Sequence, residues 1–210
     1  MFWADCWFPL VFIFHKKIFE VPHDKKRSYL FVSNHISYMD AAIIMKAYRQ
    51  PIRPLARIEL SKMPVFGLIY RNSVVSVDRS SAENRSKSVE ILKSIISKGI
   101  SVVVFPEGTF NMGNTPLKDF YDGAFKVAIE TQTPIKPVLF LDAYSRMPFE
   151  SLFAMTPGKS RVVYLDEISV ADCTLEDTAA LKNKVYDIME QTLIKYNASW
   201  KGKYHHNRVD

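Results

Sequence analysis

The sequence predicts an α/β fold: a single domain with a mostly parallel central sheet flanked by helices, plus a short apolar N-terminal segment. After residue 28, apolar β-prone runs alternate with segments of helical periodicity. Runs such as Val102–Phe105 are apolar at every position, which is typical of strands covered on both faces. The 210 residues, 48% of them apolar, are enough for one sizeable core. We therefore expect three parts, over residues 1–27, 28–200 and 201–210.

The first part, residues 1–27, is rich in aromatic and aliphatic side chains from Phe2 to Phe14 and closes with His15-Lys16-Lys17. As a helix, residues 2–14 would span roughly 20 Å, less than the roughly 30 Å of a bilayer's hydrocarbon core. A signal peptide would carry its positive charge before the apolar run, whereas here the lysines follow it. We expect a membrane-associating segment whose lysines face anionic lipid; a helix packed on the domain is the alternative.

The second part, residues 28–200, should contain the alternating strands and helices. The expected strands are 29–33, 53–57, 73–77, 101–105, 135–141 and 161–165. The expected helices are 40–48, 64–70, 82–98, 122–131 and 175–196. Ser81 should cap the third helix and Gly99 should end it in a left-handed conformation. Thr174 and Asp177 resemble a capping box before the last helix. The polar tail, residues 201–210, should be frayed.

The net charge of +6 favours anionic partners, such as a phospholipid surface, an acidic carrier or a phosphorylated small molecule. Nucleic acid is the least favoured partner, because the charge is spread along the chain and no nucleic-acid motif occurs. Cys6 and Cys173 offer neither a disulfide framework nor metal-ligand spacing, which fits a reducing compartment.

His35 and Asp40 stand five positions apart, just after the expected strand at 29–33. The carboxyl ends of strands are where open α/β sheets place their active sites. An imidazole beside a carboxylate is a general base for a hydroxyl at neutral pH, because the carboxylate fixes the tautomer and stabilises the imidazolium. We expect His35 in the turn and Asp40 in the first turn of the next helix, with the carboxylate reaching the ring. Taken alone, the pair is also compatible with a structural role.

The segment Phe105-Pro106-Glu107-Gly108-Thr109 follows a second buried strand. Pro106 cannot continue a strand ladder because it has no amide hydrogen. Glu107 and Gly108 should form a tight turn whose backbone amides point beyond the sheet and create an anion-binding hollow. Considered alone, an ordinary turn is the simpler interpretation.

Arginines close two further expected strands. Arg79 follows the strand at 73–77, and its planar guanidinium suits a phosphate or carboxylate. Pairing with a neighbouring acidic side chain is the alternative. Arg57 opens a basic and apolar stretch over 57–70 that we expect to form a membrane-facing lip or the mouth of an acyl channel. A short core helix is the competing interpretation.

The order of these segments resembles the lysophospholipid acyltransferases, the family typified by 1-acylglycerol-3-phosphate acyltransferases. His35 and Asp40 match that family's His-x4-Asp motif, and Phe105–Thr109 matches its Phe-Pro-Glu-Gly-Thr block. Arg79 lies in its second block, and the proline-rich run Pro134–Phe140 lies in its fourth. The resemblance covers roughly residues 28 to 142.

The resemblance implies transfer of a fatty acyl group from an acyl-CoA or acyl-carrier-protein thioester to the hydroxyl of a lysophospholipid. The expected acceptor is 1-acylglycerol-3-phosphate, which gives phosphatidate. The domain over 28–200 would be the acyltransferase domain, with His35 as the base and Asp40 orienting it. By the same resemblance, the acceptor headgroup would be held by Arg79, Glu107, Gly108, Thr109 and Arg57.

No metal and no bound cofactor is expected. The sequence has no Gly-x-Ser-x-Gly elbow, and neither cysteine has a histidine close in sequence, so direct attack without an acyl-enzyme is the simpler mechanism. We expect a membrane-associated enzyme at the cytoplasmic face. Its partners would be the lipid surface, the lysolipid and the thioester, with an acyl-carrier protein where that is the donor.

In many phosphatidate-forming relatives an arginine follows Glu-Gly-Thr, and this chain departs from them at that position. Phe110 and Asn111 follow here, so Arg79, Arg57 or Lys118 would supply the charge. Otherwise the acceptor is another lysolipid, such as a lyso-aminolipid. Two further alternatives are a thioesterase, in which water replaces the lysolipid, and a non-catalytic membrane-binding module.

Overall fold

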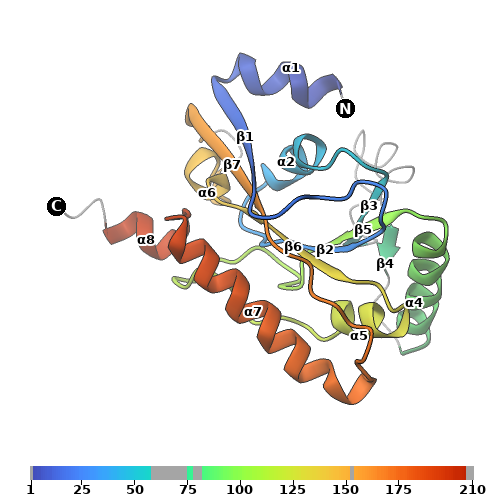
Figure 1. The fold of residues 1–210 in the computed structure, drawn as a ribbon. Helices are drawn as coiled ribbons and strands as arrows, with labels where there is room; N and C mark the ends of the chain where they lie inside the picture. The colour runs from blue at the N-terminus through green and yellow to red at the C-terminus, as the bar shows by residue number, and fades with distance from the viewer. Residues whose placement is uncertain (1, 58–74, 78–81, 152–153, 207–210) are drawn as a thin grey trace.

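The computed structural model describes residues 2–57, 75–77, 82–151 and 154–206 (Figure 1). The first half contains α1 (Phe2–Leu10), β1 (Ile13–Phe19), β2 (Leu30–Val32), α2 (Asp40–Ala47), β3 (Ile52–Arg57), β4 (Val75–Val77) and α4 (Ala82–Ser97). The second half contains β5 (Ser101–Val104), α5 (Gly123–Glu130), β6 (Ile135–Phe140), α6 (Ala143–Arg146), β7 (Gly158–Tyr164), the short 3-10 helix η2 (Leu175–Asp177), α7 (Thr178–Lys195) and α8 (Lys201–His206).

The described strands form a seven-stranded sheet in the order β1-β7-β6-β2-β5-β3-β4. The pairings from β6 through β2, β5 and β3 to β4 are parallel. β7 runs antiparallel to β6, and β1 runs parallel to β7. The expected α/β class with a mostly parallel sheet is therefore confirmed.

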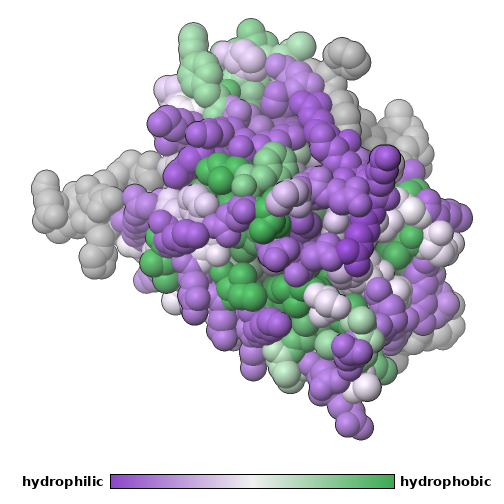
Figure 2. All heavy atoms as spheres, in the orientation of Figure 1, coloured by the Kyte–Doolittle hydropathy of each residue, from purple (hydrophilic) through white to green (hydrophobic). Residues whose placement is uncertain are grey.

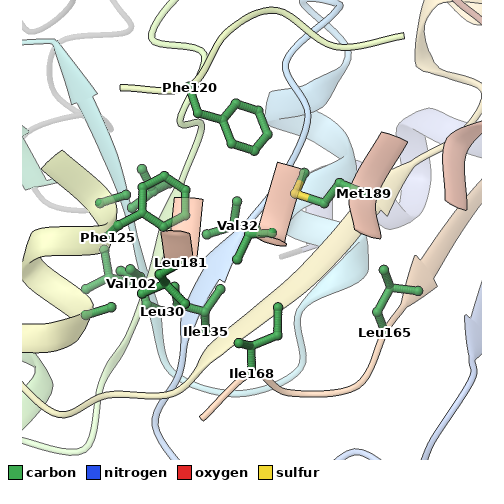
Figure 3. Packing of buried hydrophobic residues seen from close by; sticks show 14 of the residues in the cluster. Leu30, Val32, Val102, Phe120, Phe125, Ile135, Leu165, Ile168, Leu181 and Met189 are labelled. Atoms are coloured by element: carbon green, nitrogen blue, oxygen red, sulfur yellow. The ribbon is translucent and has the colours of Figure 1, made fainter. Parts of the chain in front are cut away.

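Both faces of the sheet are covered by helices, as the apolar strands predict. One core lies under α4, α5 and α7 and contains Leu30 and Val32 of β2. The other lies under α1, α2 and α6 and contains Phe31 of the same strand (Figure 1). Figure 3 shows the first core, where Leu181 and Met189 of α7 meet the strand side chains. The carboxyl ends of the parallel strands consequently lie between two helical layers.

Most of the expected elements are present with small shifts of their ends. Gly99 has φ +76 after α4, as expected for a left-handed terminator. Thr174 and Asp177 form the expected capping box. The expected helix at 64–70 and the cap at Ser81 lie outside the described residues.

The N-terminal segment differs from the expected single apolar run. The helix ends at Leu10, and residues 13–19 form the edge strand β1, paired with β7 along its whole length. Phe12, between them, adopts φ +54, a conformation usually taken by Gly or Asn. Residues 2–10 match the alternative of a helix packed on the domain, because Ala4 and Phe8 are buried and Phe8 lies in the second core. Residues 13–19 match neither interpretation, because they form a strand of the sheet.

The C-terminal tail also differs. Residues 201–206 form α8 rather than a frayed end. The indole of Trp200 donates to the carbonyl of Asn114 at 3.1 Å, and Lys203 lies over the Trp200 ring. The Trp200–Asn114 bond joins the start of this segment to the loop between β5 and α5. Residues 207–210 of the expected tail lie outside the described residues.

Asn34 joins the end of β2 to the end of β6. Its buried side chain donates to the Phe140 carbonyl at 3.1 Å and accepts from the Phe140 amide at 2.8 Å. An amide side chain thus continues the ladder where the β2 backbone turns away, which fixes the direction of the following residue.

Replacing Asn34 with alanine should lower the free energy of unfolding by roughly 2–4 kcal/mol, because two buried backbone groups of Phe140 would lose their partners. Urea unfolding measures the change. The matched control is Asn183→Ala at an exposed position on α7, which should change stability by less than about 0.5 kcal/mol. Equal effects of the two substitutions would contradict the role given to Asn34.

Candidate active site

The two motif segments meet at one edge of the sheet. β2 and β5 are parallel neighbours, with Val32 opposite Val104. The turn with His35 follows β2, and the loop with Glu107 follows β5. Their side chains therefore project from the carboxyl ends of adjacent strands, where open α/β sheets bind ligands.

His35 and Asp40 are in direct contact, as the sequence predicts. His35 Nδ1 lies 2.8 Å from Asp40 Oδ2, and the two side chains are 24% and 1% exposed, respectively. Because a carboxylate oxygen accepts, this contact assigns the Nδ1–H tautomer to the neutral ring. Nε2 is left as the proton acceptor.

Asp40 is fixed independently of the histidine. The same oxygen, Oδ2, accepts from the backbone amides of Ile36 at 2.9 Å and Ser37 at 3.0 Å. Asp40 is also the first residue of α2, where the helix dipole favours a negative charge. The turn folds around the carboxylate, which explains how two residues five positions apart come within hydrogen-bond distance.

Glu107 connects the two motif segments. Its side chain is fully buried; Oε1 accepts from the His35 amide at 2.7 Å, and Oε2 accepts from the Lys118 amide at 2.9 Å. Burial raises the pKa of Glu107 to about 8, against the opposing effect of these two amides. Its described contacts orient the backbone, and its expected role in headgroup binding stays a prediction.

The backbone of His35 is held on its other side as well. The amide of Asn111 donates to the His35 carbonyl at 2.8 Å. Asn111 is itself buried and its side chain donates to the Thr115 carbonyl. Residues 107–111 therefore fix both polar backbone groups of His35.

Aromatic rings enclose the imidazole. Phe105 stacks on the His35 ring at 4.1 Å between centroids and 15° between planes, and Phe110 meets it edge-on at 4.4 Å and 61°. The exposed Tyr38 packs against Phe110 at 4.9 Å. The wall beside the ring is thus apolar, which suits contact with the methylenes of a lipid.

Gly108, Thr109 and Lys118 lie beside this centre. Gly108 has φ +71, which permits the tight turn predicted for it. Lys118 is exposed, and its Nζ donates to Thr109 Oγ1 at 3.0 Å. The predicted roles of Gly108 and Thr109 in headgroup binding remain predictions.

Neither of the two predicted arginines has a described side chain. Arg79 lies outside the described residues. Arg57 ends β3, two strands away from β2 in the sheet order, and only its backbone is described. The expected lip over 57–70 lies, beyond Arg57, outside the described residues.

Several residues that shape the site were not predicted to contact His35, although Phe105 belongs to the Phe-Pro-Glu-Gly-Thr block. Asn34, Asn111 and the rings of Phe105 and Phe110 act through contacts across the chain. The signal that could have indicated them is adjacency: each is next to a motif residue or inside the loop that follows β5.

Neither a metal site nor a membrane-spanning helix occurs in the described segments. In residues 2–57, 75–77, 82–151 and 154–206, His, Cys, Asp and Glu side chains form no group of three or more that could hold a metal ion. No helix in those same segments has the length and apolar content needed to cross a bilayer.

Sequence comparisons match the chain to one family. The family model described as Acyltransferase matches residues 12–141. A probable 1-acyl-sn-glycerol-3-phosphate acyltransferase of Mycoplasma pneumoniae is 27% identical over 182 residues, covering 81% of this chain and 68% of that protein. The 1-acyl-sn-glycerol-3-phosphate acyltransferase alpha of Mus musculus is 32% identical over 162 residues, covering 75% and 55%. The corresponding enzyme of Limnanthes alba is 29% identical over 175 residues, covering 81% and 60%. The chain spans 55% to 68% of the length of these relatives.

A solved structure shares the fold. The crystal structure of the 1-acyl-sn-glycerophosphate (LPA) acyltransferase PlsC from Thermotoga maritima matches with a TM-score of 0.72 at 24% identity, covering 94% of this chain and 78% of that one. The two proteins therefore have the same arrangement of strands and helices.

Burial of Glu107 should make stability depend on pH. Its pKa is raised from 4.5 to about 8 in the folded protein. Between these values the folded state binds more protons than the unfolded state, so the free energy of unfolding should fall as pH rises. A pKa difference of one corresponds to about 1.4 kcal/mol, and we expect a loss of roughly a few kcal/mol over this range. Glu107→Gln cannot titrate and should give a flatter profile.

Urea unfolding between about pH 5 and pH 8 measures both profiles. The exposed Glu176 provides the matched control, because Glu176→Gln should leave the wild-type slope unchanged. Parallel profiles for the wild type and Glu107→Gln would show that Glu107 is not the titrating group.

Proposed function

We propose, because this chain belongs to the acyltransferase family whose model it matches over residues 12–141, that it transfers a fatty acyl group from a thioester to a lysophospholipid hydroxyl. The proposed acceptor is 1-acylglycerol-3-phosphate, with phosphatidate as the product, and the donor is acyl-CoA or acyl-carrier protein. The observation that carries the proposal is the His35–Asp40 contact of 2.8 Å at the carboxyl end of β2. The relatives named for this reaction support the choice of acceptor.

The geometry supports a direct transfer. His35 Nε2 takes the proton of the acceptor hydroxyl while the oxygen of that hydroxyl attacks the thioester carbonyl. The C–S bond then breaks, and the imidazolium gives the proton to the departing thiolate. General-base assistance of this kind typically gains about 10²–10⁴ in rate. Asp40 holds the ring through Nδ1 and stabilises the imidazolium while remaining ionised.

Removing the base should abolish acyl transfer. His35→Gln preserves a donor toward Asp40 but cannot accept a proton, and His35→Ala removes the side chain. Both should lower the rate by about 10²-fold or more, measured with labelled acyl-CoA and lysophosphatidate vesicles. Vesicle binding and thermal unfolding should stay close to wild type.

The same assay separates the alternatives. A thioesterase would release thiol at a rate independent of the lysolipid, and a non-catalytic membrane-binding module would give no diacyl product. A panel of lysolipids that includes a lyso-aminolipid identifies the acceptor. Substantial transfer by His35→Gln would remove His35 from its role as base.

The start of β1 is the part of the described chain that we propose to contact the bilayer. β1 runs antiparallel to β6 through their shared neighbour β7, so it begins at the edge where β2 and β6 end. Leu10, Phe12 and Phe14 are 76%, 67% and 65% exposed there. Figure 2 shows apolar side chains over this end of the molecule, near α1.

Basic residues surround this tip. Lys159 lies opposite Phe14 in the β1–β7 pairing, and both Lys159 and Lys16 are exposed. Aromatic side chains beside lysines suit the interface of an anionic bilayer. The two free cysteines are compatible with the cytoplasmic face.

Replacing Phe12 and Phe14 together with serine should weaken binding to phosphatidylglycerol-containing vesicles by about tenfold or more, since each buried Phe contributes roughly 1.5–3 kcal/mol. Vesicle sedimentation measures the loss. The control is Leu175→Ser, at an exposed residue before the amino end of α7, far from α1 (Figure 1). Unchanged vesicle binding by the double variant would place the contact elsewhere.

A further inference from the structure

We infer that Lys118, together with Thr109, binds the phosphate of the acceptor and so determines acceptor specificity. The inference rests on the proposed acyl transfer to a lysophospholipid and assigns the recognition of its charged group. It is carried by the connection of Lys118 to the base, by its single described side-chain partner and by the chemistry of that partner.

Lys118 is held in a fixed relation to His35. The amides of both residues donate to the same buried carboxyl group, that of Glu107, at 2.7 Å for His35 and 2.9 Å for Lys118. Their backbone nitrogens therefore lie within about 8 Å of each other. The buried carboxyl group of Glu107 thus ties the backbone that carries the base to the backbone that carries a cation.

The ammonium group of Lys118 is exposed and directed to a hydroxyl. It donates to Thr109 Oγ1 at 3.0 Å. Within the described segments, Lys118 takes part in none of the ion pairs. Because Thr109 Oγ1 accepts from the lysine, its own proton can be donated to an oxygen of an anion. A cation and a hydroxyl side by side are suited to a phosphate.

The geometry of the acceptor fits this placement. In 1-acylglycerol-3-phosphate, the phosphate is bonded through oxygen to the carbon next to the one that bears the free hydroxyl. A hydroxyl positioned at His35 therefore brings the phosphate within a few bonds of the base. The acyl chain of the lipid can lie along Tyr38 and Phe110, the apolar wall beside the ring.

Lys118→Gln tests the assignment. With 1-oleoylglycerol-3-phosphate the variant should show a KM for the acceptor raised by about 10- to 100-fold, the loss expected for one charge-assisted hydrogen bond, and a kcat near wild type. With monooleoylglycerol, which has the hydroxyl but no phosphate, its kcat/KM should equal that of wild type. Lys118→Arg should restore most of the affinity. Lys126→Gln, at an exposed lysine on α5, is the matched control and should change neither value.

CoA also carries phosphates, so each assay is repeated with oleoyl-pantetheine, which has none. A loss that persists with this donor supports the acceptor phosphate as the ligand. A loss seen only with oleoyl-CoA would overturn the inference and assign Lys118 to the donor. An equal loss with both acceptors would also overturn it, since it would indicate a structural role. If the wild type acylates neither acceptor, the proposed function fails, and this assignment fails with it.

Discussion

Glu107 places a carboxyl group between the ends of two neighbouring strands, where water does not reach it. One oxygen accepts the amide of His35 and the other the amide of Lys118. Strand pairing alone brings β2 and β5 together but does not fix the loops that follow them. The carboxyl group does so, because a buried acceptor left without its donors costs about 1–3 kcal/mol. The base, its orienting aspartate and the loop of residues 107–111 are consequently joined into one hydrogen-bonded unit.

Among the described residues, each polar group of His35 has a partner except Nε2, the atom proposed to react. Glu107 and Asn111 hold its amide and carbonyl, Asp40 holds Nδ1, and Phe105 and Phe110 enclose the ring. Preorganisation of this kind matters for catalysis, because a general base acts only at the geometry from which it can reach the proton. The arrangement leaves Nε2 as the reactive position without a strained backbone at His35.

The sequence predicts the central strands of the sheet better than the edge strand β1 and the C-terminal helix α8. β2, β5 and β6 are recognisable because strands buried on both faces are apolar at successive positions. The His35–Asp40 contact was predictable for a local reason, a carboxylate that can turn back onto amides of its own loop. The role of Glu107 in headgroup binding stays a prediction, but its burial and its contacts with the amides of His35 and Lys118 are features that no local pattern reveals. β1 was hidden because the break before it falls at Phe12, a residue that does not signal a left-handed conformation.

β1 also changes how the N-terminal region should be handled in the laboratory. A shortened protein that starts near residue 28 would lack an entire strand of the sheet, β1, even if it was designed only to remove an apolar membrane anchor. β7 would then become an edge strand of the sheet, and its backbone groups that pair with residues 13–19 would be exposed to solvent. Exposed edge strands of this type can pair with strands of other molecules, which leads to aggregation. Precipitation of such a fragment would thus report a missing strand rather than a missing bilayer.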